Sequence, residues 1–414
     1  MIYAVGVTRL AAIGAATAML WLSPATAGEQ AMPGATVESV VAIAKRLNPA
    51  VAAAALDFDA AIHKISTAGV LDDPTLLLQA WDVNSQGAGQ RRIGFAQDIK
   101  LWGKYGLERD VAIADADAVK FRSRAVVIDL IARVVATHAE YNATYEAVRV
   151  TREIKQRYGD ILQLLRNRYG TTSVDQQQII RAEIEAATAE GDLVRRQGQL
   201  KAAKARLNAL IGRTTSAPLA APTGFMTFRN ASLVDMQLRA RSLSPLLALA
   251  GAQTRSANKS KSLTDLNYYP DVTVSAIYVQ RPRVEDSGTF SLGFKVPLRH
   301  DVKDAEQLAA GARLSAAEAR AEAIRLRVDG EVADVWFTVE ALRKVIQIYT
   351  SRQLPPARSS VENARNGFQA GSSDIALFFE SERRFASVQL GLLKLQVELQ
   401  SKYAEMERLA GGLQ

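Results

Sequence analysis

The stretch TFSLGFKVPL, residues 289–298, poses the question that decides the fold. Its apolar residues Phe290, Leu292, Phe294 and Val296 alternate with small or polar ones, which is the two-residue period of a strand with one apolar face. Most of the remaining sequence is rich in Ala, Leu, Glu, Arg and Gln and predicts long helices. We therefore expect a mainly α fold with a small β part.

The sequence pattern occurs twice along the chain. Four landmarks recur in the same order, each displaced by about 200 residues, and agreement at all four is not expected by chance. The pairs are LNP at 47–49 with LSP at 243–245, DP at 73–74 with YP at 269–270, GFAQDI at 94–99 with GFKVPL at 293–298, and RYGTTSVD at 168–175 with FQAGSSDI at 368–375. We expect a first repeat at 28–223 and a second at 224–414, joined through Pro and small residues at 214–225.

The N-terminal residues predict export. Arg9 precedes a short apolar run, and Ala25 and Ala27 follow it in an A-x-A pattern, so residues 1–27 are predicted to be a secretory signal peptide. The chain has no Cys, which excludes disulfides and thiolate metal sites. Its formal charge of +8 is scattered among nearly as many acids, without a basic stripe, so no nucleic-acid partner is expected.

Each repeat predicts the same order of elements. A helix is expected first, at 37–68 and at 233–263. Strands are expected at 74–83, 91–99, 270–280 and 289–298. Long helices are expected at 108–167 and 302–366, the second interrupted at Pro355-Pro356, and a helix then returns in each repeat.

The strands have the length of membrane strands. Nine to eleven residues suffice to cross an outer-membrane bilayer at a tilt, and aromatic residues near the strand ends fit an interfacial girdle. The alternative is a soluble β-sandwich with ordinary core aromatics. Four strands are too few to close a membrane barrel, so several chains would have to pool their strands. The predicted lipid-facing residues are Phe95, Val274, Phe290, Leu292 and Phe294.

The whole order resembles the TolC family of outer-membrane efflux ducts. The resemblance spans essentially all of the chain after the signal peptide. It is carried by LNPAVAAAALDFDAAIHKISTAGVLDDP, GFAQDIKLWGKYGLERDVA, YYPDVTVSAIY, FSLGFKVPL, RYGTTSVD and FQAGSSD. The LWGKYG turn resembles the branch that serves heavy-metal resistance pumps of the resistance-nodulation-division type.

This resemblance implies a homotrimer in the outer membrane of a Gram-negative bacterium. Twelve strands would form one barrel, continued by a long periplasmic α-helical barrel. The duct would passively conduct metal cations or small toxic compounds delivered by a periplasmic membrane-fusion adaptor and an inner-membrane pump, and its strands would contact outer-membrane lipid. An outer-membrane component of type I protein secretion, or a soluble periplasmic coiled-coil adaptor or structural protein, are the alternatives.

The resemblance also implies where the functional residues lie. The two helical tips would form the periplasmic mouth where the adaptor docks. The tip residues are Tyr169, Gly170, Thr171, Thr172, Ser173, Ala370, Gly371, Ser372 and Ser373. Family members often carry acids six and nine residues after the second tip Gly, and these positions hold Leu377 and Glu380. Candidate gate acids are therefore Glu380, Asp374 and Asp175.

The sequence offers no sign of catalysis, a cofactor or a metal site. His63, His138 and His300 are far apart, and each is more typical of a packed or exposed helix residue than of a ligand. No phosphate loop, nucleophile elbow or carboxylate pair stands out. We do not expect an enzyme.

Overall fold

The structure, a computed structural model, describes residues 32–84, 87–169, 175–228, 231–282 and 284–412. The signal peptide predicted at 1–27 lies outside these residues. The chain is divided into two units, residues 1–32 and 33–414. The second unit is compact and contains every helix and strand of the described residues.

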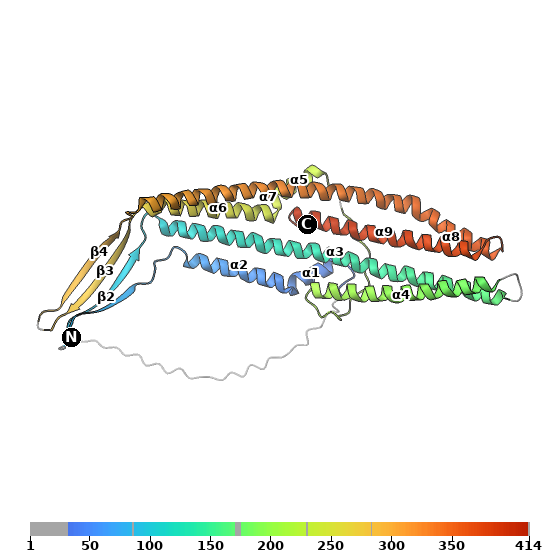
Figure 1. Ribbon diagram of the computed structural model, residues 1–414, viewed down its shortest axis with the longest axis horizontal. Coiled ribbons are helices and arrows are strands. Elements are labelled where there is room, and N and C mark those ends of the chain that lie inside the picture. Colours follow the sequence, from blue (N-terminus) through green and yellow to red (C-terminus); the bar gives the residue numbers. More distant parts are fainter. Residues whose placement is uncertain (1–31, 85–86, 170–174, 229–230, 283, 413–414) are drawn as a thin grey trace, which may run out of the picture. The chain divides into compact units, whose positions relative to one another are not determined.

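The two repeats have the same order of elements (Figure 1). The first contains α1 (Val37–Leu47), α2 (Pro49–Thr67), β1 (Thr75–Asn84), β2 (Gly87–Ile99), α3 (Lys104–Arg168) and α4 (Gln176–Leu210). The second contains α5 (Leu233–Leu243), α6 (Pro245–Asp265), the 3-10 turn η1 (Leu266–Tyr268), β3 (Asp271–Gln280), β4 (Ser287–Lys295), α7 (His300–Ile348), the π-helical turn η2 (Tyr349–Gln353), α8 (Leu354–Gln369) and α9 (Ile375–Leu409). The predicted mainly α, two-repeat fold with a small β part is confirmed.

The first predicted helix of each repeat is wrong in one respect, because the structure divides it in two. The break lies at Asn48 in the first repeat and at Ser244 in the second. Each precedes a Pro, which lacks a backbone N–H and disfavours the helical conformation of the residue before it. The Asn48 side chain accepts the Ala50 N–H at 2.8 Å and so caps the start of α2.

The long helices differ between the repeats. α3 runs for 65 residues, roughly 100 Å, without interruption. Its counterpart is α7, η2 and α8, and the five-residue π-helical turn η2 ends two residues before Pro355. Pro355 and Pro356 cannot donate to carbonyls one turn earlier, which gives the local change of winding a physical cause. The interruption predicted from the two prolines is confirmed.

The four strands form one antiparallel sheet in the order β1-β2-β3-β4. The β2–β3 pairing joins the two repeats, with Phe95 opposite Ala276. β2 begins at Gly87 rather than at 91, and β4 ends at Lys295 rather than at 298. Pro297 has no N–H to give to a ladder, which explains why the last residues of TFSLGFKVPL leave the sheet.

Each repeat has an equivalent hydrophobic core. One core gathers residues of α1, α3 and α4, and the other gathers residues of α5, α7 and α9. Gly212 and Gly411 end the returning helices with φ of +75° and +98°. A Cβ on either would lie 2.6 Å from the carbonyl oxygen of Leu47 or Leu243, so the first and last helices of each repeat meet there.

The helices of the described residues were also compared with the requirements of a membrane span. No single one is long and apolar enough to cross a bilayer. α1 and α2, which are bent by 49°, meet the length and composition only as a pair.

Candidate functional site

The turn between α8 and α9 forms the second helical tip. Ala370 ends α8 and Gly371 follows with φ of +76°. The Ser372 N–H donates to the Gly367 carbonyl at 2.8 Å, and the Gly371 N–H donates to the Phe368 carbonyl at 3.1 Å. This pair of bonds is the Schellman ending of a helix, in which the left-handed residue is most often Gly. Its Gly therefore has a local structural cause.

The serines of this tip are bound to the same turn. The hydroxyl of Ser372 donates to the Gly367 carbonyl at 3.1 Å, and that of Ser373 donates to the Ala364 carbonyl at 3.4 Å. A Cβ at Gly367 would lie 2.7 Å from the Ser373 hydroxyl oxygen, so a larger residue there would displace that hydroxyl. A hollow of about 580 Å³ between α8 and α9, lined by small and polar residues, adjoins these serines.

The first tip is described at its two ends. Tyr169 ends α3 with 55% of its surface exposed. Asp175 begins α4, and its carboxylate accepts the Gln177 N–H at 3.4 Å. Arg168 donates to the Gln369 carbonyl at 3.3 Å, so the ends of α3 and α8 adjoin. The predicted tip residues Gly170, Thr171, Thr172 and Ser173 lie outside the described residues.

The candidate gate acids lie at matching places on the returning helices. Asp374 precedes α9 as Asp175 precedes α4, and both are exposed. Glu380 is also exposed, and Leu377, which lies between Asp374 and Glu380, is 49% exposed. The structure therefore places Asp374 and Glu380 on the exposed side of α9. Their role in a gate stays a prediction.

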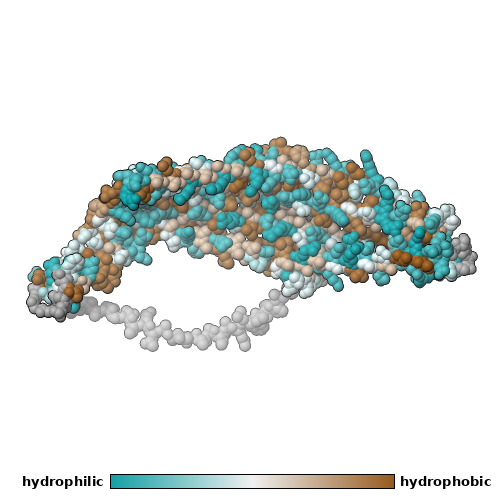
Figure 2. Space-filling view, in the orientation of Figure 1, coloured by the Kyte–Doolittle hydropathy of each residue, from teal (hydrophilic) through white to brown (hydrophobic). Residues whose placement is uncertain are grey.

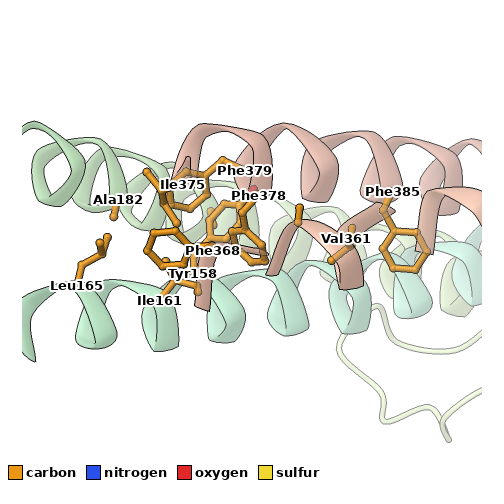
Figure 3. Close-up of a cluster of buried hydrophobic side chains, with 12 residues drawn as sticks. Tyr158, Ile161, Leu165, Ala182, Val361, Phe368, Ile375, Phe378, Phe379 and Phe385 are labelled. Atoms are coloured by element: carbon orange, nitrogen blue, oxygen red, sulfur yellow. The ribbon is translucent and has the colours of Figure 1, made fainter. Parts of the chain in front are cut away.

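An aromatic-rich cluster behind the tips joins the repeats (Figure 3). Tyr158 of α3 packs edge-on against Phe379 of α9, with ring centroids 5.0 Å apart. Burial raises the pKa of the Tyr158 phenol, and the nearby carboxylates of Glu185 and Glu382 act in the same direction. The buried members are Tyr158, Ile161, Leu165, Ala182, Ala189, Val361, Ala364, Phe368, Ile375, Phe378, Phe379 and Phe385.

Sequence reasoning missed the ion pair beside this cluster. Glu382 is completely buried, and its Oε1 lies 2.7 Å from Nε of Arg157 on α3. The second Arg157–Glu382 contact, from Nη2 to Oε2, is 3.0 Å. The sequence contained a sign of it. Glu382 stands four residues after Phe378 and three before Phe385, so the helical period places this acid on the apolar face of α9.

The five predicted lipid-facing residues share one face of the sheet. Opposed residues of a sheet point to the same side. The pairing sets Ala276 between Phe95 and Phe290, and Val274 beside Leu292. Phe290 is 72% exposed and Phe294 is 61% exposed, whereas Val274 is half-buried. Contact with lipid stays a prediction for these residues.

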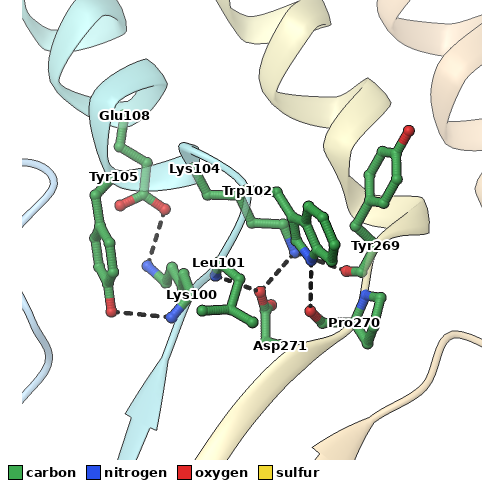
Figure 4. A network of polar contacts seen from close by, with 9 residues as sticks. All are labelled: Lys100, Leu101, Trp102, Lys104, Tyr105, Glu108, Tyr269, Pro270 and Asp271. Atoms are coloured by element: carbon green, nitrogen blue, oxygen red, sulfur yellow. Dashed lines mark hydrogen bonds and ion pairs between the residues drawn. The ribbon is translucent and has the colours of Figure 1, made fainter.

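The LWGKYG turn connects β2 to α3 and binds the start of β3 (Figure 4). Trp102 has a φ of +64°, which is uncommon for a residue other than Gly, and its indole N–H donates to the Pro270 carbonyl at 3.0 Å. The buried Lys104 donates to the Asp271 carboxylate at 2.8 Å and to the Tyr269 carbonyl at 3.0 Å. These contacts join the strand–helix junctions of the two repeats.

The histidines of the described residues do not form a cluster. The ring of His138 is buried, and its Nε2 lies 2.9 Å from the Gly34 carbonyl oxygen. Burial lowers the pKa of His138, partly offset by that bond and by Glu38. Within the described ranges, no group of three or more His, Asp or Glu side chains is arranged to hold a metal ion.

Comparison with solved structures finds the same fold in outer-membrane channels. VceC, an outer membrane protein of Vibrio cholerae, is 19% identical with a TM-score of 0.76, over 91% of this chain and 96% of that one. The open-state MtrE outer membrane channel of Neisseria gonorrhoeae is 16% identical with a TM-score of 0.78, over 91% and 89%. CusC is 16% identical with a TM-score of 0.77, over 91% and 92%.

Sequence comparison identifies the family. Comparison with curated proteins finds no significant match. The model of the family described as outer membrane efflux protein matches residues 40–213 and again residues 238–412, which is well over half of the chain. The resemblance to the TolC-like ducts is confirmed by this match and by the shared fold. The chain belongs to the outer membrane efflux protein family.

Proposed function

We propose that three copies of this chain form one efflux duct through the outer membrane. The observation that carries the proposal is that both edge strands of the described sheet, β1 and β4, have a free edge. Among the described residues β1 and β4 each have one partner strand, and lipid tolerates no open sheet edge. Four strands are also too few for a membrane barrel, whereas three chains supply twelve.

The outer helices also indicate contacts between neighbouring copies of the chain. α2 packs on α3, α3 on α6 and α6 on α7, so α2 and α7 are the outer helices of this layer. α2 is apolar, yet Ala54 is its only buried residue, and Leu56 is 67% exposed. On α7, Leu308, Leu326 and Phe337 are 76%, 58% and 58% exposed and recur after whole helical turns, so they share one face. We infer that α2 of one copy packs against α7 of the next.

Within this trimer the chain would act as a passive duct. The face of the sheet opposite Phe95 and Leu292 includes Arg92, Ser275 and Ser291, which suits a polar lumen. The tips would dock a periplasmic adaptor, which connects the duct to an inner-membrane pump of the resistance-nodulation-division type. Metal cations or small toxic compounds are the proposed cargo, and a polypeptide delivered by type I secretion is the second candidate. A soluble adaptor is not favoured, because the family match covers both repeats.

The ring can be tested by cross-linking, because the chain contains no Cys. Leu56 is exposed eleven residues before the sheet end of α2, and Ser315, which is exposed on the same face of α7 as Leu308, lies at a similar distance from the sheet. A chain carrying both L56C and S315C should cross-link head to tail into dimers and trimers and no larger species. The matched controls carry one Cys each and should stay monomeric on a denaturing gel. A ladder that extends beyond three subunits, or the absence of any cross-link, would contradict the trimer.

Transport needs a separate test with cells. A strain that lacks this protein should be sensitive to the cargo of the pump encoded with it, and the wild-type chain should restore resistance. Wild-type resistance in the strain lacking the protein, with the pump and adaptor present, would contradict the transport role. The trimer ladder would stand in that case, so the two parts of the proposal are separable.

A further inference from the structure

Arg91 occupies an unusual place at the turn end of the sheet. It lies on the apolar face, in the row Ala80–Arg91–Gln280, one row beyond Ile93 and Tyr278. Its side chain is exposed, and none of the described carboxylates forms an ion pair with it. Asp286 of the neighbouring turn instead accepts the Tyr278 hydroxyl and the Arg281 N–H.

The next residue of β2 provides the contrast. Arg92 points to the opposite face, where its guanidinium lies 4.9 Å from the centre of the Trp81 ring and donates to Gln90 Oε1 at 3.0 Å. Arg92 thus has partners within the chain. Arg91 has an exposed guanidinium, which is suited to bidentate contact with phosphate oxygens.

Two hollows lie beside Arg91 on the same face. The first, of about 540 Å³, is lined by Leu78, Ala80, Ile93, Tyr278, Gln280 and Arg91 itself, and by their strand neighbours Gln79 and Arg92. The second, of about 560 Å³, continues along the strands from Ile93 and Tyr278 to the side chains of Phe95 and Phe290. Both are open because small residues stand between the large ones: Ala80 in the first, Ala276 and Gly288 in the second. Figure 2 shows brown, hydrophobic residues beside teal, hydrophilic ones at the sheet end of the protein.

We propose that Arg91 and these two hollows bind a phosphorylated glycolipid of the outer leaflet. Arg91 holds a phosphate of the headgroup, and acyl chains lie in the hollows along Leu78, Ile93 and Phe95. Charge complementarity fixes the headgroup class, because Arg91, which is exposed and has no ion pair among the described side chains, stands where the apolar face ends. This rests on the proposed function in one respect, since it takes the apolar face as the membrane face and the turn end as the external end.

The leaflet follows from the direction of the sheet. The strands meet α3 and α7 at one end and the hairpin turns at the other, and Arg91 is near the turns. With the helices in the periplasm, the turns are outside. Lipid of the outer leaflet there is glycolipid with several acyl chains and sugar-linked phosphates, which matches one cation above two adjoining hollows.

The test is native mass spectrometry of the full mature trimer in detergent. The probes are bisphosphorylated lipid A, the same lipid without phosphates, and phosphatidylglycerol. The wild-type trimer should retain bisphosphorylated lipid A in preference to both others. R91Q should weaken this retention about tenfold, the size expected for loss of one charged hydrogen-bonded contact. K295Q removes a cation from the opposite face, where Lys295 lines neither hollow, and should retain the lipid as the wild type does.

A second variant tests binding of the acyl chains separately from binding of the headgroup. A Cβ at Gly288 meets no atom within 4 Å, so G288L should fit the fold, fill the second hollow and weaken retention of lipid A while the trimer persists. Unchanged retention in R91Q, equal loss in R91Q and K295Q, or equal binding of phosphatidylglycerol by the wild type would each overturn the proposal. The cross-linked ladder is measured on the same samples, so loss of the trimer, which would refute the proposed function, is recognised separately.

Discussion

The two repeats build the same unit with different long helices. α3 is continuous, whereas its counterpart is interrupted at η2, just before Pro355 and Pro356. In η2, the hydroxyls of Thr350 and Ser351 donate to carbonyls four residues earlier, so side chains satisfy part of the altered backbone. The difference teaches that this fold depends on how neighbouring helices pack and tolerates a local defect in one helix. The repeats should then respond differently to equivalent mutations.

The largest difference is expected at two equivalent glutamates. Glu183 and Glu382 follow Asp175 and Asp374 by the same interval. Glu183 pairs with Arg166 at the surface, where both side chains are about half exposed, whereas Glu382 is completely buried against Arg157. R157A would leave a buried carboxylate unpaired and should lower the free energy of unfolding by about 3–5 kcal/mol. R166A should lower it by less than about 1 kcal/mol.

Thermal melting of the helices, followed by circular dichroism on the assembled protein, measures both. E382A should cost less than R157A, because Arg157 is partly exposed and keeps Glu153 at 3.8 Å. Similar melting temperatures for R157A and R166A would show that burial of Glu382 does not distinguish the repeats.

The second prediction concerns the sheet. Leu292 and Ile93 are equivalent and lie on the apolar face. L292R and I93R, both near mid-strand, should each reduce assembly by about 2–4 kcal/mol, because an Arg near the bilayer midplane of a barrel carries that penalty. S291R should assemble, since the equivalent residue of the first repeat is already Arg92. Trimer content on an unheated gel gives the order, and equal loss in S291R and L292R would refute the assignment of faces.

The third prediction compares glycines with positive φ. G212A and G411A add strain and also place a Cβ 2.6 Å from a carbonyl oxygen, so both should destabilise the protein by more than about 2 kcal/mol. At Gly371 a Cβ would meet nothing within 4 Å, so G371A should cost only the strain of about 1–2 kcal/mol. Melting temperatures of the three variants test this order. Equal losses would mean that the meeting of first and last helices adds nothing.

G371V extends this test to the proposed mouth. It should leave trimer content unchanged on an unheated gel and lower resistance to the cargo in the same cells. Normal resistance would remove this Gly from transport, whereas loss of the trimer would leave it only a structural role.

The sequence was sufficient for the order of elements and for the apolar face of the sheet. Alternation and the 200-residue repetition are local patterns, and the pairing of Phe95 with Ala276 and of Val274 with Leu292 is consistent with them. Contacts between distant helices were not predictable, because no pattern around Arg157 points to a residue on α9. The helix break at Asn48 was predictable from Pro49, since Pro restricts the residue before it.

The smallest predicted difference depends on pH. Each long helix uses a ring nitrogen to contact a backbone carbonyl just before the first short helix of its repeat. His138 Nε2 lies 2.9 Å from the Gly34 oxygen, and the Trp336 indole N–H donates to the Ala231 oxygen at 2.9 Å. The two contacts are alike in length, but imidazole titrates near neutral pH and indole does not.

Acid should therefore weaken the first repeat at His138. Burial lowers the folded-state pKa of His138 from its ordinary 6.5, despite the opposing influence of the Gly34 bond and Glu38. Below pH 6.5 the unfolded chain binds the proton more readily, so the free energy of unfolding is highest above that pH and falls as the pH drops toward the folded pKa. H138Q keeps an N–H donor without a titrating group. Its melting temperature should fall less than that of the wild type between about pH 7.5 and about pH 5.5. Equal falls in both proteins would show that the buried imidazole does not make the repeats differ in acid.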